Sequence, residues 1–311
     1  MSRYSARKAI LCKLEATYGT DPNPTGSADF MLVHDFQFPD PMAGSDVELA
    51  HALPYLSANP TTPADLHRRC TFKVPLTGSG TPGTAPAWAP LLRACGVAET
   101  LETGPDQVVY NPVSGGFESA TLYAHMDGTL YKMLGMRGNA RFVVPASGIP
   151  VIEFEFWGLF SKPSDTALPT IDASAYQKAR AATPANTPTF TLGGTSVPLR
   201  NFNLDFGNSV EVRKLINEDQ VKITDRADMI ETQIAAGDLA TYDPFTDADT
   251  AAERAIVLTH GTTPGNIATI SVPKAQTMRP GVTEAQGQDE WTVGFRPLPG
   301  SGNDQWTLTL T

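Results

Sequence analysis

The most constraining stretch of this sequence is a pair of β-type segments joined by a turn, within residues 135–160. Arg141–Val144 and Val151–Phe156 are rich in β-branched and aromatic residues, which favour strands. Residues 145–150 (PASGIP) lie between them and contain two prolines and a glycine that tolerates positive φ. The stretch therefore predicts a β-hairpin.

The second segment of this hairpin has two chemically different faces. Ile152, Phe154 and Phe156 alternate with Glu153 and Glu155. Because side chains of a strand alternate between its two faces, the three apolar residues should meet a core and the two carboxylates should face away from it.

Composition points to a loop-rich β protein and away from several functional classes. Gly and Pro number 26 each, and charged residues make up only 18%. A net charge of −10 argues against tight nucleic-acid binding, which depends on Lys and Arg. No apolar run approaches the roughly 20 residues of a membrane span, and the N-terminal segment is too interrupted for a signal peptide. The three cysteines, Cys12, Cys70 and Cys95, form no CxxC pair and are expected to be reduced.

The segment pattern predicts a mainly β fold with two tandem domains, each with one flanking helix and long loops. We expect a first domain over residues 1–165, a linker rich in Pro, Ala, Thr and Ser over 166–189, and a second domain over 190–311. The helices are expected at Ala87–Ala94 and Phe245–Arg254. Pro39–Pro63 has few regular signals and is predicted to be a long loop.

An internal repeat supports the division into two domains. Residues 299–302 (PGSG) followed by 306–310 (WTLTL) align without a gap on 145–148 (PASG) followed by 152–156 (IEFEF). Upstream, residues 36–38 (FQF) resemble 202–204 (FNL). Chance similarity between two hairpins is the alternative explanation.

The sequence offers no catalytic or metal-binding signature, so we expect no enzyme activity, no cofactor and no metal. The five histidines are scattered, and His67 and Cys70 have no further ligands at matching spacing. Asp243–Asp249 lacks the central glycine and the terminal glutamate of a calcium loop. Nucleophile-elbow and P-loop motifs are absent from the sequence, and Gly78-Ser-Gly80 is interpreted as a loop rather than a phosphate cradle. This result favours a structural or binding role.

A series of short motifs in the first 165 residues resembles the major tail tube proteins of long, non-contractile-tailed bacteriophages. Their order along the chain carries the resemblance, and they are EATYGTDP (15–22), APAWAPLLRACG (85–96), VYNPVS (109–114), ESATLYAHMDG (118–128), GMRG (135–138) and PVIEFEFWG (150–158).

This resemblance implies β-sandwich or barrel units that join edge to edge into rings, and rings that stack into a tube for DNA ejection. Two such domains per chain imply a trimeric, pseudo-sixfold ring, whereas an immunoglobulin-like second domain implies a hexamer. The implied partners are other copies of the chain, a tape measure protein inside the tube, tail terminator and distal tail proteins at its ends, and genomic DNA passing through without tight binding. The implied location is the virion, after assembly in the bacterial cytoplasm, with no membrane contact.

Two sets of residues are candidates for roles in such a tube. Glu153 and Glu155 are expected to line the lumen, with Thr307 and Thr309 as their counterparts in the second copy of the repeat. Contacts between rings are expected from the long segment and from the N-terminal arm, namely Pro41, Met42, Asp46, Glu48, Leu53, Tyr55, Tyr4 and Arg7.

A two-domain β-sandwich binding module of the carbohydrate or adhesin type is the alternative function. Such modules use exposed aromatic platforms. Trp88, Trp157, Trp291 and Trp306 lie instead in patterns typical of a core.

Overall fold

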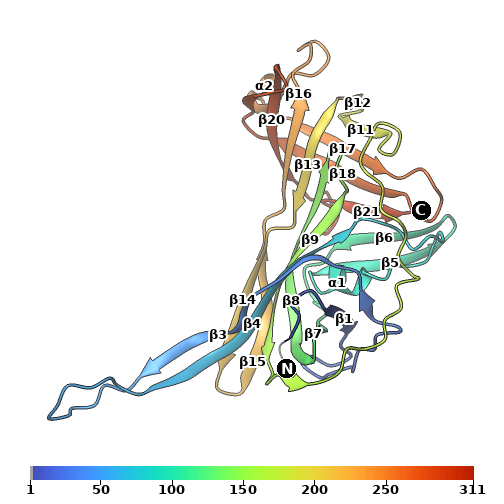
Figure 1. Ribbon diagram of the computed structural model, residues 1–311. Helices are drawn as coiled ribbons and strands as arrows, with labels where there is room; N and C mark the ends of the chain where they lie inside the picture. Colours follow the sequence, from blue (N-terminus) through green and yellow to red (C-terminus); the bar gives the residue numbers. More distant parts are fainter. Residues whose placement is uncertain (1–2) are drawn as a thin grey trace.

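The computed structural model describes residues 3–311 and confirms a mainly β fold (Figure 1). Its only helices in that range are α1 (Ala89–Arg93) and α2 (Pro244–Asp249), close to the two predicted positions. The strands of residues 3–165 (the first half) are β1 Lys8–Leu14, β2 Phe30–Met31, β3 His34–Glu48, β4 Thr61–Pro75, β5 Val97–Thr103, β6 Asp106–Pro112, β7 Ala120–Met126, β8 Thr129–Pro145, β9 Val151–Phe160 and β10 Ser164–Asp165. Those of residues 189–311 (the second half) are β11 Thr189–Leu192, β12 Thr195–Ser196, β13 Leu199–Asp205, β14 Asn208–Leu215, β15 Glu218–Arg226, β16 Met229–Ala235, β17 Glu253–His260, β18 Ala268–Thr277, β19 Gly281–Ala285, β20 Gln288–Pro297 and β21 Thr307–Leu310.

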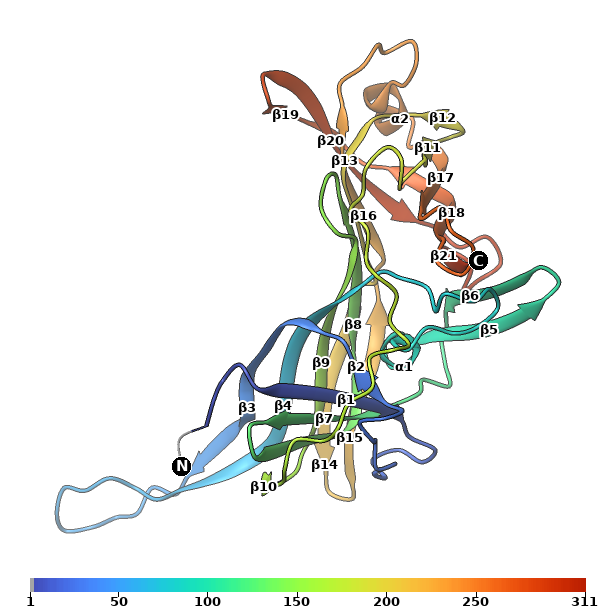
Figure 2. The ribbon, with the colours of Figure 1, turned by 45° about the vertical axis from the view of Figure 1, so that its right-hand side comes forward.

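One continuous antiparallel sheet runs through both halves, and we call it the main sheet. Its strands follow the order β3-β4-β9-β8-β13-β16-β20-β19. The two halves meet inside this sheet, where β8 pairs with β13. Figure 2 shows β3 and β19 at its opposite ends.

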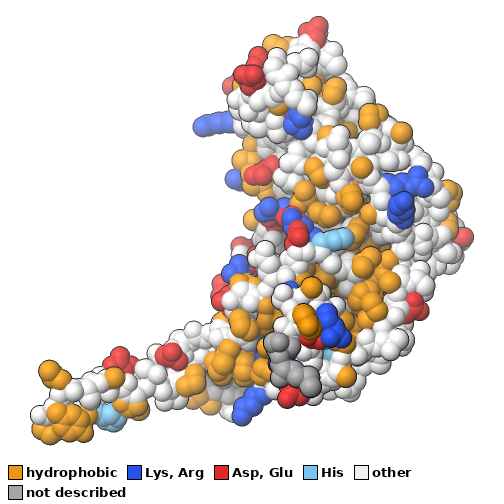
Figure 3. Space-filling model, viewed as in Figure 1, with side chains coloured by type: hydrophobic (Ala, Val, Ile, Leu, Met, Phe, Trp, Pro, Cys, Tyr) orange, Lys and Arg blue, Asp and Glu red, His pale blue; other side chains and the backbone are white. Residues whose placement is uncertain are grey.

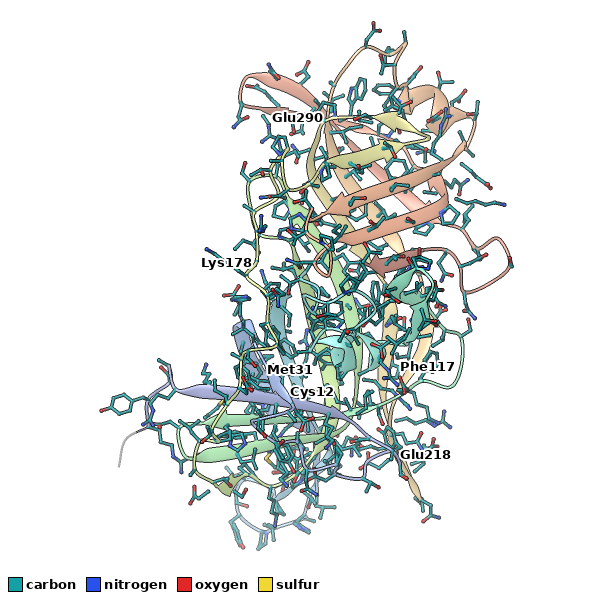
Figure 4. The ribbon with its side chains drawn as sticks, turned by 90° about the vertical axis from the view of Figure 1, so that its right-hand side faces the viewer. Cys12, Met31, Phe117, Lys178, Glu218 and Glu290 are labelled. Atoms are coloured by element: carbon teal, nitrogen blue, oxygen red, sulfur yellow. The ribbon has the colours of Figure 1, made fainter. Side chains whose placement is uncertain are left out.

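A second layer of strands packs against one face of the main sheet. In the first half it consists of β2, β1, β7 and the beginning of β8. In the second half it runs β11-β17-β18-β21 and continues into β6 and β5 of the first half. Strands β8 and β18 pass from one layer to the other, since each pairs with strands of both. Figure 4 looks onto the second layer, with the main sheet behind it.

A single hydrophobic core fills the space between the layers and crosses the boundary between the halves. Phe142 of β8 contacts Phe206 edge-on, with ring centroids 5.3 Å apart, and Phe206 stacks on Trp306 at 4.5 Å. All three side chains are fully buried. Because aromatic side chains bury large areas, this cluster ties the two halves together strongly.

The predicted hairpin at residues 141–156 is confirmed, but its proposed second copy is wrong. β8 and β9 pair directly, with Phe142 opposite Ile152. β20 and β21 do not pair with one another. Instead β20 joins the main sheet, whereas β21 lies between β18 and β6 in the second layer. Shared turn residues (Pro, Ser and Gly) produced the similarity without a shared strand pairing.

The long loop predicted at Pro39–Pro63 is only partly right, because about half of this range is strand. β3 continues to Glu48 and β4 starts at Thr61, so only residues 49–60 are irregular. Four register shifts interrupt this ladder, which explains why no clean alternation was visible in the sequence. We call residues 40–69 the arm, and Figure 1 shows it projecting from the body.

Candidate assembly surfaces

Glu153 and Glu155 lie on the face of the main sheet that points away from the core, which we call the groove face. Both are half-buried, and Ile152, Phe154 and Phe156 on the opposite face are buried, as the alternation predicted. The register places Lys73 opposite Glu153 and Thr71 opposite Glu155. The Lys73 Nζ lies 3.0 Å from Glu153 Oε1, and Arg69 forms an ion pair with Glu155.

The groove face also carries an ion pair across the joint between the halves. Arg141 of β8 donates through Nη2 to Asp205 Oδ2 of β13 at 2.6 Å, and the Asn139 amide donates to Asp205 Oδ1 at 2.8 Å. Burial acts to raise the pKa of Asp205, but these donors and the Gly207 N–H outweigh it, so the pKa is lowered. Charge on this surface is therefore largely paired, and the two glutamates are not an unscreened acidic strip.

Grooves hollow this face in both halves and at the joint between them. The first, of about 640 Å³, is lined by Lys73, Arg141, Glu153, Glu155 and Asp205 among others. The second, of about 350 Å³, is lined by residues at matching places in the second half, including Asn203, Glu231, Gln233, Thr292 and Gly294. Figure 3 shows the left side of the molecule hollowed, with acidic and basic side chains along it.

Thr307 and Thr309 do not share the groove face with the two glutamates. Both belong to β21 in the second layer, where they are half-buried and Thr309 lies opposite Val109 of β6. In the second half the strand corresponding to β9 is β20, because it pairs with β16 as β9 pairs with β4. Thr292 and Gly294 therefore occupy the places of Glu153 and Glu155.

The main sheet ends in unpaired strand edges on both sides. Within residues 3–311, β3 pairs only with β4, and β19 pairs only with β20. Apolar residues remain uncovered there, since Val282 of β19 is 61% exposed and Phe36 and Phe38 of β3 are only half-buried. Such edges pair readily with another chain.

The arm presents a second uncovered apolar surface. Its exposed large apolar side chains are Met42, Val47, Leu49, Leu53, Tyr55 and Leu56. Figure 3 shows orange side chains gathered at its end, at the lower left. Of the predicted contact residues, Pro41, Met42, Asp46, Glu48, Leu53 and Tyr55 belong to this arm and all six are exposed. Clustered apolar side chains on a projecting element are typical of a protein contact.

Arg68 anchors the arm to the body, a role that its sequence context does not indicate. Its guanidinium donates to the carbonyls of Pro41, Lys132 and Ser161 at 2.6–2.8 Å and stacks over the Phe160 ring at 4.7 Å. The side chain is fully buried without a carboxylate partner, and burial lowers its pKa to about 10. The one indication in the sequence is that this arginine lies within a segment whose apolar residues alternate as in a strand.

The remaining predicted contact residues, Tyr4 and Arg7, lie beside the β7–β8 turn. The Tyr4 N–H donates to Asp127 Oδ2 at 2.6 Å, and Arg7 forms an ion pair with Asp127 Oδ1 at 2.9 Å. Both side chains are exposed. The N-terminal segment is thus attached through its backbone and through Arg3 and Arg7, while the Tyr4 ring remains uncovered.

Over residues 3–311, no three His, Cys, Asp or Glu side chains are grouped to hold a metal ion. The same range holds no helix that is long and apolar enough to cross a membrane. Cys12, Cys70 and Cys95 are free and buried. Trp88, Trp291 and Trp306 are buried, and Trp157 is half-buried beneath Arg69, so the tryptophans form no exposed platform.

Comparison with known proteins adds no relative. A scan against protein-family models finds no match, and a search of curated proteins finds none either.

Proposed function

We propose that this protein is a structural subunit of a tail tube, which assembles into rings that stack around a central channel. The observation that carries the proposal is the main sheet. Its two halves are already joined edge to edge at β8–β13, and the strands at both of its ends have free edges. A sheet with two complementary open edges can close into a ring of copies, which removes the edges altogether.

The groove face is our candidate for the lumen. It points away from the core, it is hollowed in both halves, and its first groove carries paired charges such as Lys73 and Glu153. Since each cation near Glu153 and Glu155 is matched by a carboxylate, this surface offers little excess positive charge to hold phosphates. Such a lumen lets DNA pass without tight binding.

The arm is our candidate for stacking between rings. It projects from the sheet, carries uncovered apolar side chains and is held at its base by Arg68. We propose three copies per ring. Each chain contributes two similar four-stranded parts to the main sheet, so three chains supply the six parts of the pseudo-sixfold ring that the resemblance implies. The tape measure protein, the tail terminator and the distal tail proteins would bind the completed tube.

Electron microscopy and analytical ultracentrifugation of the purified chain test the proposal. Rings or tubes of constant diameter, with a ring mass of three chains, are expected. A chain that stays monomeric at all concentrations, even when the proteins of the tube ends are added, contradicts the proposal. Glycan binding by that monomer would favour a binding module instead.

A further inference from the structure

We infer that neighbouring copies join through β19 of one copy and β3 of the next, in the register that β8 and β13 use within the chain. In this arrangement Phe38 lies opposite Val282 and Gln37 lies opposite Thr283. The inference rests on the proposed self-assembly and adds to it the contacting strands and their alignment.

The first support is that both halves of the main sheet follow one order of pairing. β3-β4-β9-β8 in the first half corresponds to β13-β16-β20-β19 in the second. Two apolar pairs lie four residues apart in each half, Cys70–Phe156 and Val74–Ile152 in the first and Ile230–Phe295 and Ile234–Trp291 in the second.

This correspondence aligns the two ends of the main sheet with the two strands of the internal joint. Phe142 of β8 lies opposite Ile152, and Val282 of β19 lies opposite Trp291, so Val282 takes the place of Phe142. On the other side, Gln37 lies opposite Thr71 and Asn203 lies opposite Glu231, so residues 36–38 (FQF) take the place of 202–204 (FNL).

The internal joint shows what such a contact does for the core. Phe142 lies opposite Leu204 and Val144 opposite Phe202, and all four side chains are at most 1% exposed. At the ends of the main sheet the matching side chains lack this cover. Val282 is 61% exposed, and Phe36 and Phe38 are half-buried. Copying the joint between chains covers these residues and extends the core into the neighbour.

Charge also fits this register. Glu284 of β19 takes the place of Val144 and would lie opposite Phe36 of the next copy. In that copy the Lys8 Nζ lies 5.9 Å from the Phe36 ring centroid and is exposed. A carboxylate brought against Phe36 therefore meets an ammonium group. In the isolated chain, the charge of Glu284 disfavours non-specific pairing of the β19 edge with other strands.

Cysteine cross-linking tests the register directly. Directly opposed residues of an antiparallel pair have Cα atoms about 4.5–5.5 Å apart, which a disulfide can bridge. We expect the Q37C/T283C double variant to form, under mild oxidation, covalent oligomers that end at the closed ring of three chains. Because β3 and β19 lie at opposite ends of the main sheet (Figure 2), this bond cannot form within one chain. The native cysteines are buried and should not interfere.

The Q37C/A285C variant is the matched control, since Ala285 lies on the same face as Thr283 but two residues away. It should remain largely un-cross-linked. If the unsubstituted chain assembles but Q37C/T283C does not cross-link, or the control cross-links instead, the inferred register is wrong and self-assembly stands. If the unsubstituted chain does not assemble, the proposed function fails, and the inference fails with it.

A charge exchange provides a second measurement that is independent of disulfide geometry. E284K should weaken assembly at least tenfold by placing two cations together, and K8E should weaken it comparably. The K8E/E284K double variant should regain most of the loss. Additive losses in the double variant would contradict the contact between Glu284 and Lys8, and with it the register.

Discussion

At the scale of single residues, this protein depends on polar groups at places where strands of different parts meet. Asp205 lies at the joint between the halves and accepts from Asn139 and Arg141. Arg68 lies at the base of the arm and donates to three carbonyls. Because buried or half-buried polar groups are costly without partners, both residues fix geometry as well as contribute stability.

Asp205→Asn should lower the free energy of unfolding by about 1–3 kcal/mol at neutral pH, because a charge-assisted pair with Arg141 is lost. The pKa of Asp205 is lower in the folded chain than its ordinary value of 3.8. Its contribution is therefore fully present above pH 3.8 and disappears as the pH falls through the lowered pKa. Urea unfolding of the unsubstituted chain and of the Asp205→Asn variant, from neutral pH to below pH 3.8, measures this contribution. A difference in stability between the two that persists unchanged in acid would contradict this account.

Arg68→Met should cost about 3 kcal/mol or more, because three carbonyls lose a charged donor. Arg69→Met is the matched control. Its side chain is 40% exposed and loses two solvent-accessible ion pairs, with Glu155 and Asp40, and its contact with the Trp157 ring, so it should cost less, about 1 kcal/mol. Chemical unfolding gives the two values, and limited proteolysis should show faster cutting of the arm in the Arg68 variant alone. Equal losses for the two variants would argue against the anchoring role.

At the scale of elements, two hairpins extend from the main sheet and have different surroundings. The hairpin β14–β15 packs on the first half, where Val221 is fully buried and exchanges hydrogen bonds with Arg137 and Tyr18. Figure 4 shows Glu218 near its free end. The arm occupies the equivalent position on β3–β4 but has no such support, and its apolar residues remain exposed. A hairpin of this kind is suited to a partner outside the chain.

Replacing residues 44–66 by Asn-Gly removes most of the arm and keeps the pair Ala43–His67 next to a two-residue turn. We expect an unchanged melting temperature, ring formation and a loss of stacking into tubes. Electron microscopy distinguishes rings from tubes. Tubes of normal length from this variant would show that stacking does not need the arm.

At the scale of the whole molecule, the groove face would decide what the proposed channel presents to its contents. Glu153 and Glu155 are paired with Lys73 and Arg69, so their replacement changes both the pairing and the net charge of the face. These two effects can be separated, because Lys73 lies directly opposite Glu153.

Glu153→Lys with Glu155→Lys should impair tube assembly or slow genome ejection, since it leaves four cations together on the proposed lumen. The exchange Lys73→Glu with Glu153→Lys keeps the pair and the net charge, and should assemble and eject normally. Assembly by microscopy and infectivity of complemented phage are the measurements. Normal infectivity of the first variant would rule out a role for this face in DNA passage.

The local residue pattern alone was sufficient to predict elements whose neighbours are near in sequence. The alternation at Ile152–Phe156 predicted which face of β9 is buried. Both helices were expected near their observed places. The similarity of residues 36–38 to 202–204 also identified strands with equivalent positions.

Only the tertiary structure decided how these elements combine. The similarity of residues 145–156 to 299–310 reflects turn chemistry, and β21 belongs to another layer because its partners are β18 and β6. The arm could not be predicted because register shifts break the alternation of its residues. The role of Arg68 could not be predicted because its three carbonyl partners lie 27–93 residues away in the sequence. Side-chain period and turn residues are local properties that a sequence displays. Strand pairing joins distant segments through backbone groups that are the same in nearly every residue, so the edges left open by the fold emerge only when all the strands are in place.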